Sequence, residues 1–206
     1  MGIQVLSANT DGIVIKCPRN RYDELNGIIA DWESKTRFNT EETRYKAIYS
    51  RDVNNYIAVL DKPEKGKRYK GKGAFGEPTL RKDPQIAVCV NAVVEHIIEG
   101  TRIEDTVRNC QDISLFCSIQ SVTGGAEKDG VYLGKMVRWY YRKNEYGAIV
   151  RAGSQNKVAK STGGWPIMTM PTDIPDDLDY QWYINEAYDM LKQVGFYSQA
   201  KQGTLF

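Results

Sequence analysis

The sequence predicts an α+β protein, and three patterns carry that prediction. β-Branched residues fill two short runs near the start and flank the turn Asn9-Thr10-Asp11-Gly12, a strong hairpin signal. Apolar residues recur every three or four positions from residue 86 to 98, which indicates an amphipathic helix. A further helical pattern runs from about residue 180 to 194. We therefore expect antiparallel strands first and helices later.

The strand-rich part ends near residue 83, and its elements form the pattern of a small antiparallel sheet backed by a helix. Pro18 ends the second run, and a Gly- and Lys-rich segment closes this part. The expected elements, in order, are strands over 2–8 and 12–17, a helix over 20–35, strands over 44–50 and 56–60, and the basic segment 62–76.

The pattern becomes helical after Pro84. The apolar stripe stops at Gly100, a natural helix C-terminus. Residues 131–158 are expected to be extended again, with strands at "KMVRWYYR" and "AIVRAG". The acidic stretch "TDIPDDLDY" lacks the Gly and the terminal Glu of a calcium loop, so we expect it to cap the final helix.

Composition excludes several classes of protein. The formal net charge is only +2, so bulk charge implies neither a nucleic-acid nor a membrane partner. The four cysteines form no Cys-x-x-Cys pair and the chain has one histidine, which argues against structural zinc. The N-terminus does not resemble a signal peptide, and no apolar run is long enough to span a bilayer. We expect a cytoplasmic protein.

The residues that could bind a metal ion or a phosphate group are Asp11 and a cluster of cations. Carboxylates are natural ligands of Mg²⁺, yet Asp-Gly is also among the commonest hairpin turns, and residue type alone favours a plain turn. The basic segment has two interpretations: it contacts the phosphates of duplex DNA, or it is a solvated loop without a partner. The cations concerned are Lys62, Lys65, Lys67, Arg68, Lys70 and Lys72.

Taken in order, the motifs resemble the C-terminal palm and thumb part of family B DNA polymerases, especially viral ones. The family's Asp-Thr-Asp-Ser turn matches Asn9, Thr10, Asp11 and Gly12. "SRDVNNYIAVL" stands at its tyrosine signature and retains Tyr56. "KGKGAF" and "LRKD" follow at the positions of its next two motifs, and they supply Lys72, Gly73, Phe75, Arg81, Lys82 and Asp83.

The resemblance implies a partial palm over 1–83, a mainly helical thumb over 84–197, and a flexible tail over 198–206. It also implies that Asp11 is one of two palm aspartates that hold catalytic Mg²⁺ at the dNTP phosphates, in a two-metal site completed by a partner chain or a missing N-terminal segment. Asn9 departs from the family aspartate and brings no charge.

The resemblance further implies contacts with the primer–template duplex. The last five residues separately look like the peptide with which replication proteins dock into bacterial sliding clamps, with Gln202, Leu205 and Phe206 as its contacts; a tail folded back onto the thumb is the alternative. The residues expected to contact DNA are Asn54, Asn55, Tyr56, Lys67, Arg68, Lys70, Lys72, Arg81, Lys82, Lys157 and Lys160.

Parts that family B catalysis needs have no counterpart in this sequence. These are an exonuclease domain, the first palm aspartate and a fingers helix with its lysine. We therefore expect the chain to be inactive alone, as half of a split viral polymerase or a fragment, acting in the cytoplasm of a bacterial host. Two other interpretations are a non-catalytic DNA-binding replisome protein derived from that fold, and an unrelated α+β binding protein.

Overall fold

The structure is a computed structural model, and it describes residues 2–10, 12–76, 82–83 and 86–195. These residues form a mixed α+β fold with antiparallel sheets, as predicted. The α-helices are α1 (Tyr22–Thr36), α2 (Ala87–Glu99), α3 (Ile103–Asn109) and α4 (Tyr180–Gln193), with short 3₁₀ turns η1 (Arg19–Arg21), η2 (Gly73–Phe75) and η3 (Ile113–Phe116). The strands are β1 (Gln4–Ala8), β2 (Ile13–Lys16), β3 (Tyr45–Asp52), β4 (Asn55–Glu64), β5 (Lys67–Lys72), β6 (Lys82–Asp83), β7 (Ser118–Lys128), β8 (Val131–Tyr141), β9 (Val150–Arg151) and β10 (Gly164–Pro166).

The N-terminal elements agree with the sequence predictions. β1 and β2 pair antiparallel, with Ala8 opposite Ile13 and a bulge between Val5 and Ser7. They form a two-stranded sheet of their own. The helix α1 ends at Arg37, whose left-handed backbone lets its N–H bond to the carbonyl of Glu33.

The second sheet has the order β3-β4-β5, and β5 was not predicted. The basic segment is therefore largely a β-hairpin rather than a loop. Lys65 and Gly66 both have positive φ and form its turn, which matches the twist of the flanking strands.

Residues 86–195 are less helical than expected. β7 and β8 are each eleven residues long, and they pair with β6, β9 and β10 in a five-stranded sheet. α2 and α4 lie close to the predicted bounds. Gly100 ends α2 with φ +72°, and Asp179 caps α4 by accepting from the N–H of Trp182 at 3.1 Å.

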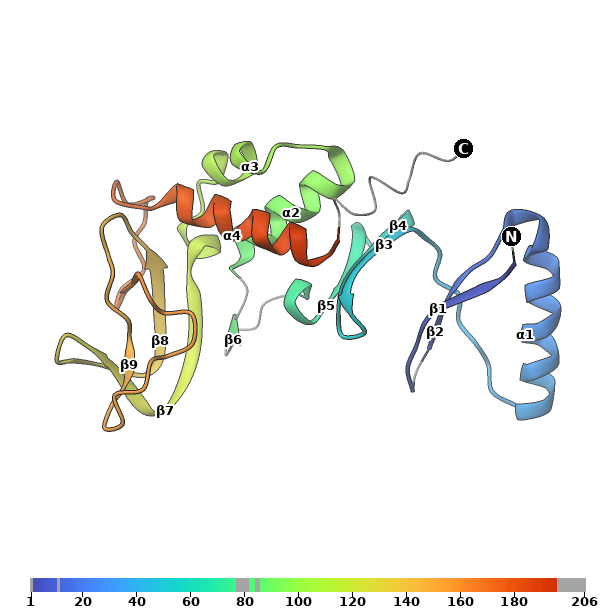
Figure 1. The fold of residues 1–206 in the computed structure, drawn as a ribbon, viewed down its shortest axis with the longest axis horizontal. Coiled ribbons are helices and arrows are strands. Elements are labelled where there is room, and N and C mark those ends of the chain that lie inside the picture. The colour runs from blue at the N-terminus through green and yellow to red at the C-terminus, as the bar shows by residue number, and fades with distance from the viewer. Residues whose placement is uncertain (1, 11, 77–81, 84–85, 196–206) are drawn as a thin grey trace.

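One hydrophobic core joins the second sheet to the helices. Ile57 and Phe75 belong to the same buried cluster as Val93 of α2 and Leu191 of α4. This core therefore extends across residue 83, where the sequence suggests a domain boundary. Along the long axis, Figure 1 shows the β7–β9 strands, then the helices and the β3–β5 sheet, then the β1–β2 hairpin, with α1 at the far end.

No helix within the described ranges combines the length and the apolar character needed to cross a bilayer.

Candidate nucleic-acid interface

The turn between β1 and β2 is closed by Asn9. Its backbone N–H donates to the carbonyl of Gly12 at 3.0 Å, and its side-chain oxygen accepts from the N–H of Gly12 at 2.9 Å. This side-chain bond is the kind that favours Asn in tight turns. Thr10 and Gly12 are exposed on the same turn. Asp11, the predicted metal ligand, lies outside the described residues.

The face of the second sheet that carries Tyr56 also carries Lys72. Tyr56 lies opposite Ser50 on β3 and opposite Lys72 on β5, so the three side chains form one row across the sheet. In the next row on the same face, Ala58 lies opposite Lys70. The intervening Ile57 points to the other face and is fully buried. The structure thus brings Tyr56, Lys70 and Lys72 onto one face, whereas the sequence had suggested them only separately.

The β3–β4 turn is held by Asp52, which the sequence analysis missed. Its carboxylate accepts from the N–H of Asn54 at 2.9 Å and from the amide group of Asn55 at 2.8 and 2.9 Å. The hydrogen bonds from Asn55, then from Asn54, hold the pKa of Asp52 below its ordinary value. The sequence signal for this role was the position of Asp52 two residues before Asn54, because an aspartate side chain in a turn commonly accepts from the backbone N–H two residues on.

Asn55 is a structural residue as well as a predicted DNA contact. Its side-chain oxygen accepts from the N–H of Ala74 at 2.8 Å, which ties the start of β4 to η2. The nitrogen and the oxygen of the Asn55 side-chain amide are therefore both hydrogen-bonded within the protein. Asn54, in contrast, has an exposed side chain at the tip of the turn.

The "KGKGAF" motif has a clear backbone role. A Cβ on Gly71 would lie 1.8 Å from the carbonyl oxygen of Phe75. A Cβ on Gly73, which has φ +61°, would lie 2.2 Å from the carbonyl oxygen of Asn54. The two glycines allow the chain to fold η2 against the sheet, which buries Phe75 and leaves Lys72 exposed beside Tyr56.

Two of the predicted DNA-binding cations on the second sheet form ion pairs within the chain. Arg68 bonds Glu95 and Glu99 of α2, each at 2.5 Å. Lys70 lies 3.3 Å from Glu64 and 3.3 Å from the hydroxyl of Thr43. Lys72 forms no ion pair among the described residues, and Lys67 is exposed near the β4–β5 turn. Lys72 is accordingly the cation of this face best placed to meet a phosphate.

The remaining predicted contacts are dispersed. Lys157 is exposed on the loop after β9, and Lys160 pairs with Glu186 of α4 at 3.2 Å. Lys82 is in the short strand β6, and nothing is described of its side chain. Arg81 and the clamp-docking residues Gln202, Leu205 and Phe206 lie outside the described residues.

In the part of the chain that the structure describes, no three side chains of His, Cys, Asp or Glu come together as metal ligands, and Asp11 lies outside that part.

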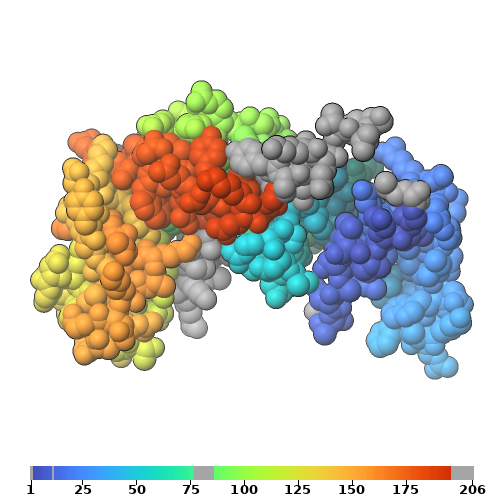
Figure 2. Space-filling view, viewed as in Figure 1, coloured from blue at the N-terminus to red at the C-terminus, as the bar shows by residue number. Residues whose placement is uncertain are grey.

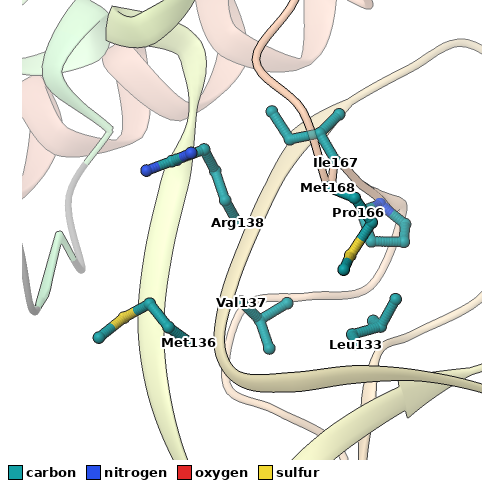
Figure 3. A pocket seen from close by; sticks show the side chains of 7 residues that line it. All are labelled: Leu133, Met136, Val137, Arg138, Pro166, Ile167 and Met168. Carbon is teal, nitrogen blue, oxygen red and sulfur yellow. The ribbon is translucent and has the colours of Figure 1, made fainter.

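The surface has two hollows besides this face. One, of about 490 Å³, is lined by Arg142, Lys143, Tyr146 and Trp182 among others, and Arg142 stacks on Trp165 at 3.3 Å from the ring centre. A smaller apolar one, of about 120 Å³, lies between β8 and the segment 166–168. Figure 3 shows Val137 on the same side of β8 as Leu133, with Met136 and Arg138 pointing away from it.

The outline of the molecule is concave on one side. Figure 2 shows this hollowed edge between the β7–β9 end and the N-terminal end, and the turn end of the β1–β2 hairpin lies at its margin. No family model, no curated protein and no solved structure matches this chain.

Proposed function

We propose that this chain is the C-terminal palm and thumb portion of a DNA-directed DNA polymerase. It grips the primer–template duplex and supplies one metal-binding aspartate, Asp11. A separate N-terminal polypeptide carries the exonuclease, the first palm aspartate and the fingers. The chain alone is inactive, because one carboxylate does not hold a pair of metal ions about 4 Å apart.

The observation that carries this proposal is the row formed by Ser50, Tyr56 and Lys72 on the outer face of the second sheet. Lys72 is exposed and has no ion-pair partner among the described residues, so its charge is available to a phosphate. Tyr56 is half-buried beside it and offers a ring and a hydroxyl to the sugar-phosphate backbone.

The arrangement of the hairpin supports a shared active site. The β1–β2 turn is short, and the turn end of the hairpin lies at the margin of the concave side (Figure 2). The proposal places the carboxylate of Asp11 where ligands from another polypeptide complete the metal site. Asn9 closes the turn and therefore positions its neighbours rather than binding metal itself.

Primer extension with Mg²⁺ tests the proposal. A labelled primer–template is incubated with this chain alone, with the polypeptide from the same source that carries the exonuclease, fingers and first palm aspartate, and with both. We expect extension only in the mixture. Asp11→Asn removes it, whereas Asp105→Asn, an exposed aspartate at the first turn of α3, leaves it unchanged.

A second candidate function is favoured by Asn9. The side-chain oxygen at this position is committed to Gly12, and the residue brings no negative charge to the turn. A non-catalytic DNA-binding replisome protein derived from the same fold has no need of that charge. A mixture that forms a stable complex on DNA but never extends the primer supports this alternative and overturns the first.

A further inference from the structure

The first quarter of the chain has no core. Among the described residues from 2 to 56, none is buried, and the first buried side chain is Ile57. Tyr49 of β3 packs against the main core, but the hairpin and the four-turn helix α1 before it have no buried side chain. Segments of this size are normally stabilised by burying apolar side chains, so a covering surface is missing here.

The hairpin exposes both apolar side chains and strand edges. Ile13 and Ile15 are two residues apart in β2, so their side chains point to the same face of the hairpin. Val5 lies opposite Ile15, which places Val5 on that face too. Val5 and Ile13 are 63% and 62% exposed. No third strand among the described residues pairs with β1 or β2, and a two-stranded hairpin alone is at best marginally stable.

The helix α1 carries a second uncovered strip. Ile28 and Trp32 are one turn apart on one face and are 57% and 47% exposed. Phe38 stacks on Trp32 with ring centres 6.1 Å apart, and it is itself 67% exposed. The aromatic pair is therefore held in place while its outer surface faces solvent, which is typical of an anchor for a partner.

Some charges around these side chains are paired. Arg21 bonds Glu24, Lys35 bonds Asp31 and Arg44 bonds Glu42, each at 2.7 Å or less. Other exposed charges form no ion pair among the described residues; these are Lys16, Arg19, Asp23, Arg37 and Glu41. A partner that fits this surface presents apolar side chains and an extended strand, with charged groups around them.

We infer that residues 2–38 are the docking surface for the companion polypeptide of the proposed polymerase, which adds a β-strand to the β1–β2 hairpin and covers Ile28, Trp32 and Phe38. This inference rests on the proposed function for the identity of the partner. Strand addition satisfies the open backbone edges, and the apolar side chains of the partner bury Val5 and Ile13. The added strand extends the β1–β2 sheet.

The test measures binding between this chain and its companion polypeptide. Ile13→Glu and Trp32→Glu each place a charge in the proposed interface, and Val131→Glu is the matched control on the exposed start of β8, 63% exposed. We expect the first two to weaken the complex by about 30-fold or more and the control to leave it unchanged. Since all three side chains are exposed and outside the core, circular dichroism and thermal melting of the isolated chain should not change.

Hydrogen exchange supplies the readout specific to strand addition. In the complex, amides of residues 4–8 or 13–16 should become protected, because the partner strand pairs with one hairpin edge. Binding that is insensitive to both Glu substitutions, absence of any complex, or a complex without that protection overturns the inference. So does a dimer of this chain alone that Trp32→Glu disperses, since a second copy is then the occupant.

The two proposals fail in different ways. If Trp32→Glu disrupts a complex that never extends a primer, the docking surface stands and the polymerase function fails. If the mixture extends primers and Trp32→Glu and Ile13→Glu leave both binding and extension intact, the function stands and the docking surface is wrong.

Discussion

The ammonium group of Lys128 lies 2.9 Å from the carboxylate of Glu145, and only 3% of the Lys128 side chain is exposed. The same ammonium donates to the carbonyl of Gly164 at 3.0 Å. The other oxygen of Glu145 bonds Arg142 at 3.1 Å. These contacts join the end of β7, the loop after β8 and the start of β10, so a buried charge network holds the sheet at this end of the molecule.

Replacing Lys128 by Met should destabilise the protein by about 3 kcal/mol. The cost arises because Glu145, in a partly buried position, loses one of its two cationic partners and the carbonyl of Gly164 loses its buried donor. Urea unfolding followed by circular dichroism measures the effect. Lys135→Met, at an exposed site on β8, is the control and should change the free energy of unfolding by less than about 0.5 kcal/mol. Equal stability of the two variants would show that the network contributes nothing.

Acid should weaken the same network. Burial by itself raises the pKa of Glu145, but the hydrogen bonds from Lys128 and Arg142 outweigh it and hold that pKa below its ordinary value. A depressed carboxyl pKa contributes stability that is present above the unfolded-state pKa and is lost as the pH falls through the folded-state pKa. We therefore expect the melting temperature to fall as the pH drops below about 4.5.

Glu145→Gln isolates this contribution. The variant lacks the titrating group, so its melting temperature should be lower than that of the native chain at pH 7, and the gap should narrow as the pH falls. A gap that stays constant from pH 7 to pH 3 would contradict the assignment.

Alkaline titration tests the burial of Tyr140 and Tyr141 at the end of β8. Burial, then the hydrogen bond to Asp177 at 2.9 Å, raises the pKa of Tyr140 to about 12. Burial also raises the pKa of Tyr141 to about 12. In an absorbance titration at the phenolate band, Tyr140 and Tyr141 should ionise only above about pH 11. Tyr140→Phe should remove one late-titrating group, and an unchanged late phase would contradict its assignment.

Gly71 is predicted to be irreplaceable even by alanine. The added methyl group would meet the carbonyl oxygen of Phe75 at 1.8 Å, so the backbone of η2 would have to move and expose Phe75. We expect Gly71→Ala to cost at least about 2 kcal/mol in unfolding free energy. Gly27→Ala is the control, because its Cβ meets nothing within 4 Å and alanine favours a helix. A Gly71→Ala protein as stable as this control would exclude the close approach.

Local signals in the sequence predicted most element positions. Asn9 and Gly12 mark the first hairpin, Gly100 ends α2 and Asp179 begins α4, and each acts through its own backbone or its near neighbours. Such short-range chemistry can be read from a sequence because its partners are within four residues.

The strand β5 was missed because its stability comes from distant contacts. Its lysines and glycines are poor strand formers, and the strand forms because Tyr69 packs on the core and Gly71 permits the approach of Phe75. β7 was missed for a related reason. Gly124 and Gly125 interrupt its pattern with positive φ, and β8 supplies the pairing.

The candidate site could be predicted only in outline. Sequence placed Tyr56 and Lys72 in neighbouring segments, and the register of the sheet brings them into one row. Whether a cation is available to DNA depends on acidic residues far along the chain. Arg68 forms ion pairs with Glu95 and Glu99, and Lys160 forms one with Glu186. No local sequence pattern predicts these pairs.

Among the basic residues of the second sheet, Lys72 should contribute to DNA binding and Arg68 should not. Lys72 has no ion-pair partner among the described residues, whereas Arg68 is held by two carboxylates of α2. A phosphate contact by Lys72 releases one counterion, so Lys72→Ala should reduce the slope of log affinity against log salt by about 1 and weaken binding to all sequences alike. Arg68→Ala should leave the slope unchanged and cost at most about 1 kcal/mol in stability, because its ion pairs are partly exposed. Fluorescence anisotropy of a labelled primer–template duplex over a range of salt concentrations measures both slopes. If Arg68→Ala lowers the slope and Lys72→Ala does not, the duplex contacts the part of the sheet beside α2 rather than the row of Ser50, Tyr56 and Lys72.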